Sequence, residues 1–233
     1  NPIASADDHL YQVNDADVKL LAVDPASFGD RAETLREKAD RPLQIMGLGP
    51  LGAHVDLLAA MSQQTPQKLR SLGRSDDECV LVYTGGTTGK PKGVLHTHRV
   101  QVAMILMQMA DFDWPQESRF LAMTPITHAS GALMMPVLLR SGTVIMHPGF
   151  EVKHFCHLVQ THRVTCTFMV PTMIYVLLDS PVRETHDLSS LETIMYGAAP
   201  MSPARLTEGI SELGNIFMQL YGQSEVPMAM TVL

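Results

Sequence analysis

Residues 83–93 read Tyr-Thr-Gly-Gly-Thr-Thr-Gly-Lys-Pro-Lys-Gly and directly follow an apolar run, Cys79-Val80-Leu81-Val82-Tyr83. The apolar run predicts a buried strand, because a short hydrophobic stretch bounded by turn residues is typical of one. In residues 83–93, glycines allow backbone N–H groups to turn toward an anion, threonine hydroxyls can donate to phosphate oxygens, and lysines supply positive charge. The combination predicts a strand followed by a loop that binds a triphosphate.

The Walker A loop, Gly-x-x-x-x-Gly-Lys-Ser/Thr, is the nearest alternative for this segment. If its Gly-Lys is aligned on Gly89-Lys90, Thr84 stands where the first glycine belongs and Pro91 where the magnesium-binding hydroxyl belongs. The mismatch at both ends predicts a phosphate loop of another kind. A glycine-rich turn that only links two strands is the alternative without a function.

The same stretch resembles the signature loop of the adenylate-forming enzymes, which include acyl-CoA synthetases, luciferases and the adenylation domains of peptide synthetases. Their pattern is Tyr-Thr-Ser-Gly-Thr-Thr-Gly-x-Pro-Lys-Gly, and Gly85 replaces the serine when positions are counted back from Thr87. This replacement removes one hydroxyl donor but leaves the backbone donors and both lysines. The resemblance implies that the loop holds the β- and γ-phosphates of ATP through Thr84, Gly85, Gly86, Thr87, Thr88, Gly89, Lys90 and Lys92.

A second segment, Pro125-Ile126-Thr127-His128-Ala129-Ser130-Gly131, is similar to the family's Pro-x-x-His-x-x-Gly motif. In acyl-activating members this histidine lies beside the carboxylate substrate, so the resemblance implies that His128 contacts the acid. An aromatic residue often precedes the histidine, whereas this chain has Thr127. Taken alone, a histidine beside an apolar helix is more often structural than catalytic.

A third segment, Tyr196-Gly197-Ala198-Ala199-Pro200-Met201-Ser202, is similar to the family's Gly-Gly-Ala-Pro-Leu-Ser loop. The backbone of that loop runs alongside the adenine and the acyl pocket, which implies nucleotide contacts for Gly197, Ala198 and Ala199. The residues alone also fit an ordinary turn from a strand into a helix, with Ser202 as N-cap and Pro203 in the first turn.

A fourth segment, Tyr221-Gly222-Gln223-Ser224-Glu225, resembles the family's Tyr-Gly-x-Thr-Glu motif, with serine in place of threonine. The resemblance implies that Tyr221 and Gly222 contact the adenine, that Ser224 binds the α-phosphate and that Glu225 holds Mg²⁺. One glutamate is a sufficient protein ligand, because Mg²⁺ keeps several waters and phosphate oxygens. With four motifs in family order, the chain is identified as a member of the adenylate-forming enzymes.

The alternation of strand and helix patterns predicts an α/β fold with parallel sheets covered by helices. The predicted strands are Val18–Val23, Leu43–Gly47, Cys79–Thr84, Arg119–Thr124, Thr143–His147, Val164–Val170, Thr193–Tyr196 and Asn215–Leu220. The predicted helices are Phe28–Ala39, His54–Ala60, His98–Ala110, Gly131–Leu139, Val152–Thr161, Pro171–Leu178 and Pro203–Ser211. We expect residues 1–62 to form a first lobe segment, 63–78 a loop or linker, and 79–233 the ATP- and acyl-binding lobe. The resemblance implies part of the large N-terminal domain.

The composition of the 233 residues, with 45% hydrophobic and 18% charged residues, is typical of a globular protein. A net charge of −7 argues against nucleic-acid binding through a basic face. Cys79, Cys156 and Cys166 lie in apolar runs without metal-type spacing, which predicts buried, reduced thiols in a cytoplasmic protein. No apolar run approaches the roughly 20 residues that a transmembrane helix needs.

Two further histidines, His96 and His98, have a spacing that could bind a metal on a strand. The sequence suggests no third ligand for such a site. Both are therefore predicted to be structural.

The activity implied by the resemblance is ATP-dependent conversion of a carboxylic acid to an acyl-adenylate and then to an acyl-CoA thioester. The partners are the acid, ATP with Mg²⁺, and CoA, and nothing in the sequence predicts an oligomeric state. His128 and the methionines of residues 102–110 and 132–139 favour a fatty or otherwise hydrophobic acid, although such methionines equally fit helix packing. Because the sequence lacks the family's C-terminal domain with its catalytic lysine, we expect this chain to be inactive by itself.

Two alternatives stay open. One is an adenylation domain that delivers an amino or aryl acid to a carrier protein. The other is a nucleotide-binding module without catalytic activity.

Overall fold

The computed structural model describes residues 4–68, 73–84 and 90–232. By its internal contacts the chain divides into two compact units, residues 1–74 together with 80–95, and residues 75–79 together with 96–233. Residues 80–95, which carry the phosphate motif, thus group with the N-terminal elements and not with the segment that follows them.

The first unit contains a small parallel sheet with helices. Its elements before the phosphate motif are α1 (Ala6–Asp15), β1 (Leu20–Val23), α2 (Pro25–Lys38), β2 (Gln44–Gly47), β3 (Val55–Asp56) and α3 (Leu57–Ser62). The strands pair in the order β1-β2-β3, all parallel. Helix α2 begins earlier than predicted because Asp24 caps it, accepting from the backbone N–H of Ser27, and because Pro25 fits the first turn.

The phosphate motif lies between β4 (Glu78–Thr84) and β5 (Lys92–Thr97), which form a two-stranded sheet. The prediction of a strand before the motif is confirmed, but the prediction that it is buried is wrong, because Cys79, Val80 and Leu81 are exposed. The predicted burial of Cys79 fails for the same reason. A two-stranded sheet has no interior of its own, so its side chains are buried only where another element covers them. Strand β5 was not predicted.

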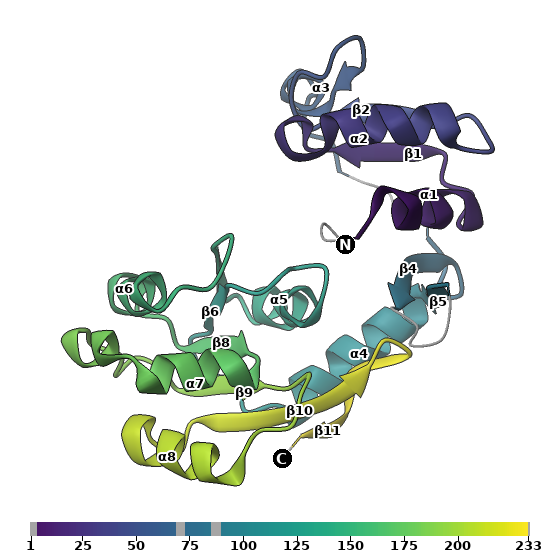
Figure 1. Cartoon of the computed structure of the whole chain (residues 1–233). Coiled ribbons are helices and arrows are strands. Elements are labelled where there is room, and N and C mark those ends of the chain that lie inside the picture. Colours follow the sequence, from purple (N-terminus) through teal and green to yellow (C-terminus); the bar gives the residue numbers. More distant parts are fainter. Residues whose placement is uncertain (1–3, 69–72, 85–89, 233) are drawn as a thin grey trace. The chain divides into compact units, whose positions relative to one another are not determined.

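The second unit is built on a six-stranded sheet with the strand order β11-β10-β9-β8-β6-β7 (Figure 1). Its strands are β6 (Arg119–Ala122), β7 (Thr143–Met146), β8 (Cys166–Met169), β9 (Thr193–Tyr196), β10 (Phe217–Gln223) and β11 (Val226–Val232). The predicted parallel pairing is confirmed from β7 through to β10. Strand β11 pairs antiparallel with β10 at the edge, and this strand was not predicted.

Helices cover both faces of this sheet. They are α4 (His98–Asp111), α5 (Ala129–Leu139), α6 (Val152–His162), α7 (Pro171–Asp179) and α8 (Pro203–Leu213), with a short 3₁₀ helix η1 (Pro181–Thr185) after α7. Helices α6 and α7 pack on one face, where Leu121 and Ile194 join their core, while α5 packs on the other, with Phe120 and Met195. Successive residues of one strand thus enter opposite cores, and the strands are buried because both faces are covered. Among the described residues, none of the helices has the length and hydrophobicity needed to cross a membrane.

Candidate active site

Three of the four motifs follow strands of the same parallel sheet at its carboxyl edge. His128 follows β6, the loop 197–199 follows β9, and the segment 221–225 ends β10. The chain runs from β6 to β7 on one side and then crosses to β8 on the other side of β6, so the carboxyl ends of β6 and β8 flank a topological switch point. In open α/β sheets, ligands bind in the crevice at such a point.

The backbone of the His128 loop is fixed, and its side chain is exposed. The His128 N–H donates to the carbonyl of Pro125 at 3.0 Å, and the Gly131 N–H donates to the carbonyl of His128 at 3.1 Å. A Cβ added to Gly131 would lie only 1.8 Å from the carbonyl oxygen of Ile126, so only glycine fits there. Residue 128 is the N-cap position of α5, yet its imidazole makes no capping bond. The loop therefore presents an imidazole that its own helix does not use.

The loop after β9 combines a close backbone approach with a strained residue. A Cβ at Gly197 would lie 2.5 Å from the carbonyl oxygen of Leu220 on the neighbouring strand. Ala198 has a φ of 68°, in the left-handed region that costs a residue with a Cβ roughly 1–2 kcal/mol. Such strain is found at ligand-binding sites, where the surrounding structure holds it. Ala199 follows in the same exposed loop.

The predicted cap after this loop is confirmed in position only. Ser202 occupies the N-cap position of α8 and Pro203 its first turn, but the Ser202 side chain makes no capping hydrogen bond. Instead the Ser202 N–H donates to the hydroxyl of Tyr175 at 2.8 Å.

The segment 221–225 forms the tip of the β10–β11 hairpin. Gln223 pairs with Val226, so Ser224 and Glu225 form the turn, and the register shifts between Tyr221 and Gln223. Gly222 lies at this irregularity, and interruptions of a strand ladder are frequent next to active sites, where they redirect side chains. Tyr221 is 56% exposed. Glu225 is exposed too, and its carboxylate makes no ion pair or hydrogen bond with residues that the structure describes.

The phosphate motif belongs to the other compact unit. Its predicted ligands Gly85, Gly86, Thr87, Thr88 and Gly89 lie outside the described residues. On the near side of the motif, the Thr84 hydroxyl donates to the carbonyl of Lys92 at 3.4 Å. The ammonium of Lys90 lies 5.1 Å from the ring centroid of Tyr11, whereas Lys92 is exposed and has no ion-pair partner among the described residues.

Helix α1 contacts both flanks of the motif, which the sequence did not predict. Besides the contact of Tyr11 with Lys90, the Tyr83 hydroxyl donates to the carboxylate of Asp15 at 2.6 Å, and the rings of Tyr11 and Tyr83 meet edge to face. Burial, together with this carboxylate, raises the pKa of Tyr83 well above its ordinary value. Asp15 is the last residue of α1, where the helix dipole disfavours a carboxylate, so its contribution is the tertiary hydrogen bond.

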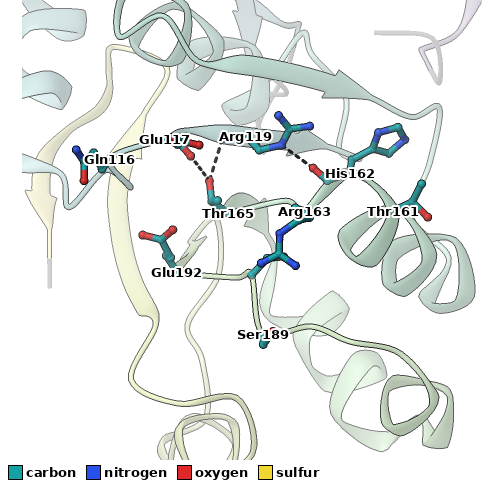
Figure 2. Close-up of a pocket in the computed structure, with 10 residues that line it drawn as sticks. Gln116, Glu117, Arg119, Thr161, His162, Arg163, Thr165, Ser189 and Glu192 are labelled. Atoms are coloured by element: carbon teal, nitrogen blue, oxygen red, sulfur yellow. Dashed lines mark hydrogen bonds between the residues drawn. The ribbon is translucent and has the colours of Figure 1, made fainter.

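A pocket of about 710 Å³ lies at the opposite, amino edge of the six-stranded sheet (Figure 2). Thr165 and Arg119, which line it, hold neighbouring loops. The Thr165 hydroxyl donates to the carbonyl of Glu117 at 2.9 Å, and the Arg119 guanidinium donates to the carbonyl of His162 at 2.6 Å. None of the predicted site residues lines this pocket. We therefore assign its residues a structural role, in connecting the loops that precede the strands, and not a role in the reaction.

Comparison with known proteins bears directly on the identity of the chain. Over its full length it is 42% identical to the medium/long-chain-fatty-acid–CoA ligase FadD8 of Mycobacterium tuberculosis, of which it covers 42%. It is 38% identical over 160 residues to a feruloyl-CoA synthase from Amycolatopsis sp, and this match covers 68% of this chain and 32% of that protein. The chain thus spans less than half the length of these relatives.

The fold agrees with that of a solved structure. The N-terminal domain of FACL13 from Mycobacterium tuberculosis superposes with a TM-score of 0.87 at 22% identity, over all of this chain and 57% of that one. The predicted fold class, parallel sheets with helices as in the N-terminal domain of adenylate-forming enzymes, is thereby confirmed. The AMP-binding enzyme family model matches residues 1–233. The chain therefore belongs to the family of AMP-binding enzymes.

Proposed function

We propose that the protein carrying this chain is an AMP-forming acid–thiol ligase. The carboxylate oxygen of the acid attacks the α-phosphorus of ATP, pyrophosphate leaves with the electrons of the broken P–O bond, and an acyl-adenylate forms. The sulfur of CoA then attacks the acyl carbonyl, loses its proton, and displaces AMP. The observation that supports this most directly is that the His128, Gly197–Ala199 and Tyr221–Glu225 motifs share the carboxyl edge of one sheet, whose switch point the His128 loop flanks.

The nucleotide is assigned to the loops after β9 and β10. The exposed side chain of Tyr221 offers an aromatic face for adenine. The strained backbone at Ala198 lies in the loop after β9, the strand that pairs with β10. Ser224 supplies a hydroxyl for the α-phosphate. Thr84, Lys90 and Lys92 at the ends of the phosphate motif are assigned to the β- and γ-phosphates. Acceleration in such a reaction comes from positioning and charge stabilisation, which these groups are suited to provide.

Glu225 fits the requirement for a magnesium ligand. Its carboxylate is exposed at the hairpin tip and is not neutralised by any cation in the described part of the chain. Mg²⁺ is held in nucleotide sites by one or two carboxylates together with phosphate oxygens and waters. When bound there, the ion neutralises charge on the phosphates; the part of Glu225 is to orient it.

A fatty acid is the substrate that we favour. FadD8 is named for medium- and long-chain fatty acids, and this relative matches the whole chain. The helices that follow β5 and β6 also carry exposed apolar side chains, including Met107 and Met135, and flexible methionines suit acyl chains of varying length. The match to feruloyl-CoA synthase, which covers less of the chain, supports an aryl acid as the second candidate.

The experiment uses the protein in its full reading frame. The purified protein is incubated with ATP, Mg²⁺, CoA and a panel of fatty, aryl and amino acids, and thioesters are detected by mass spectrometry. We expect acyl-CoA from medium- or long-chain fatty acids, and aryl products would assign the second candidate. Adenylate without thioester would indicate a carrier-protein acceptor, and failure to form any adenylate would overturn the proposal.

A further inference from the structure

His96 is buried near the end of β5, and both of its ring nitrogens have partners. His96 is only 3% exposed. Its Nε2 lies 2.8 Å from the backbone carbonyl oxygen of Ser224, and its Nδ1 lies 2.9 Å from the side-chain nitrogen of Gln101 in α4. The first partner, Ser224, is one of the two turn residues of the β10–β11 hairpin.

These partners define which nitrogen of His96 carries the proton. A carbonyl oxygen can only accept, so Nε2 carries the hydrogen and donates to Ser224. Nδ1 then accepts from the amide N–H of Gln101, which holds the ring in this tautomer and orientation. The carbonyl that His96 binds belongs to the peptide bond between Ser224 and Glu225.

The hairpin tip lacks regular support at this point. In the register of the described residues, the Gln223–Val226 pair lies next to the turn, and the register shift separates it from the Tyr221–Thr231 pair. Bulges interrupt the ladder locally, so the turn gains fewer backbone hydrogen bonds from its own strands than a regular hairpin does. The bond from His96 comes from outside the hairpin and fixes the turn at its central peptide.

We propose that His96 is a positioning residue for the Ser224–Glu225 turn, setting the direction of the Ser224 hydroxyl and of the Glu225 carboxylate toward the phosphates and their metal. The proposal rests on the function assigned to these two residues above. It adds a functional consequence to the structural role predicted for His96 from sequence, which the partners of both ring nitrogens support.

The test uses the protein in its full reading frame and two substitutions of the histidine. His96→Leu keeps an apolar side chain of similar size but cannot donate, and His96→Gln retains a donor. Hydrogen–deuterium exchange of the peptide covering residues 217–232 reports on the turn, and calorimetric titration of ATP at varied Mg²⁺ reports on the site without turnover. We expect His96→Leu to raise the turn's exchange rate and the Mg²⁺ midpoint about tenfold each, and His96→Gln to recover part of both.

A matched control removes a buried hydrogen bond elsewhere in the same unit. The Ser190 hydroxyl, also buried, donates to the carbonyl of Val164 at 2.8 Å near the amino edge of the sheet. Ser190→Ala should lower the melting temperature without changing exchange at the turn or the Mg²⁺ midpoint. If His96→Leu leaves both quantities unchanged, or if Ser190→Ala changes them equally, His96 has no positioning role.

Two further variants keep the outcomes separable. Gln101→Leu retains the histidine but releases its orientation, so it should give a smaller change in the same direction even if His96→Leu does not fold. Lys92→Ala and Glu225→Gln test the proposed function itself. If neither weakens ATP binding while His96→Leu still speeds exchange at the turn, the assigned function fails and the link from His96 to the turn stands.

Discussion

Strand β4, in the strand pair β4–β5, and strands β6, β8 and β9 of the larger sheet all contain apolar runs, yet they differ in burial. Leu81 in β4 is 40% exposed, whereas Leu121 in β6 is fully buried between two layers of helices. The phosphate motif thus lies in a strand pair with exposed side chains and is supported by polar contacts from α1. The other three motifs follow strands of a sheet that is buried on both faces. The difference shows that covering elements, rather than strand composition, decide how firmly a motif is held.

The strongest test of this difference is the same substitution in both regions. Leu121→Ala removes a fully buried side chain and leaves a cavity, so we expect a loss of about 2–5 kcal/mol in the free energy of unfolding. Leu81→Ala should cost less, about 1–2 kcal/mol, because a side chain that is 40% exposed withdraws less apolar surface from water than a fully buried one. Urea denaturation measures both. Equal losses would show that β4 is as firmly packed as β6.

A second test concerns how rigidly the packed unit holds its loops. Gly131→Ala places a methyl group against the carbonyl of Ile126, so we expect about 1–3 kcal/mol of destabilisation and loss of acid activation as the His128 loop moves. Gly149→Ala is the control, since a Cβ there meets no atom within 4 Å. Thermal unfolding and adenylate formation are measured for both. A fully active and stable Gly131→Ala protein would show that the loop adapts.

The polar support of the phosphate motif can be measured by a double-mutant cycle. Tyr83→Phe and Asp15→Asn each remove the hydrogen bond between β4 and α1, and we expect a coupling free energy of about 1 kcal/mol. The pKa of Tyr83 is raised, so the folded protein holds the phenol proton more tightly than the unfolded chain does. The contribution of neutral Tyr83 to the free energy of unfolding is therefore present in full below about pH 10 and is lost as the pH rises further. Tyr83→Phe should remove that alkaline loss. Additive single effects would contradict the contact.

The smallest expected effect is a difference in thiol reactivity between β4 and the six-stranded sheet. Cys79 in β4 is exposed, while burial raises the pKa of Cys156 to about 11 and that of Cys166 to about 12. The thiolate is the reactive form, so only Cys79 should react with a thiol reagent at pH 8 in the folded protein. Peptide mapping of the labelled protein identifies the sites. Labelling of Cys166 at the rate of Cys79 would mean that the sheet opens readily.

Much of the fold could be predicted from patterns along the chain. The β-α alternation predicts the parallel sheet, and β6, β8 and β9 fall within predicted strands because they are apolar and bounded by helix starts. Strand β5 was missed because Lys92–Thr97 is mostly polar and is a strand only through its pairing with β4. The antiparallel edge strand β11 follows the last motif and pairs with β10 across a register shift between Tyr221 and Gln223. Such pairing is tertiary information that local composition does not contain.

The residues assigned to the candidate site stay predictions from the motifs, and the contacts that support them were not predicted. The motifs identify His128 and Glu225, but the contact of Asp15 with Tyr83 and that of His96 with Ser224 join residues far apart in sequence. The strain at Ala198 and the close fit at Gly131 likewise depend on neighbouring backbone. Spacing along the chain cannot predict them, because each requires the fold to bring its partner near.

We propose above all that the carboxylate of Glu225, at the tip of the β10–β11 hairpin, holds Mg²⁺ in an adenylate-forming site. Acid-dependent ATP–pyrophosphate exchange in the protein's full reading frame, compared between the unsubstituted protein and Glu225→Gln over a Mg²⁺ titration, tests it most directly. We expect exchange that requires a fatty acid, and a loss of at least about tenfold with a raised Mg²⁺ midpoint in Glu225→Gln. Exchange with the same rate and the same Mg²⁺ midpoint in both proteins would contradict the assignment of the site.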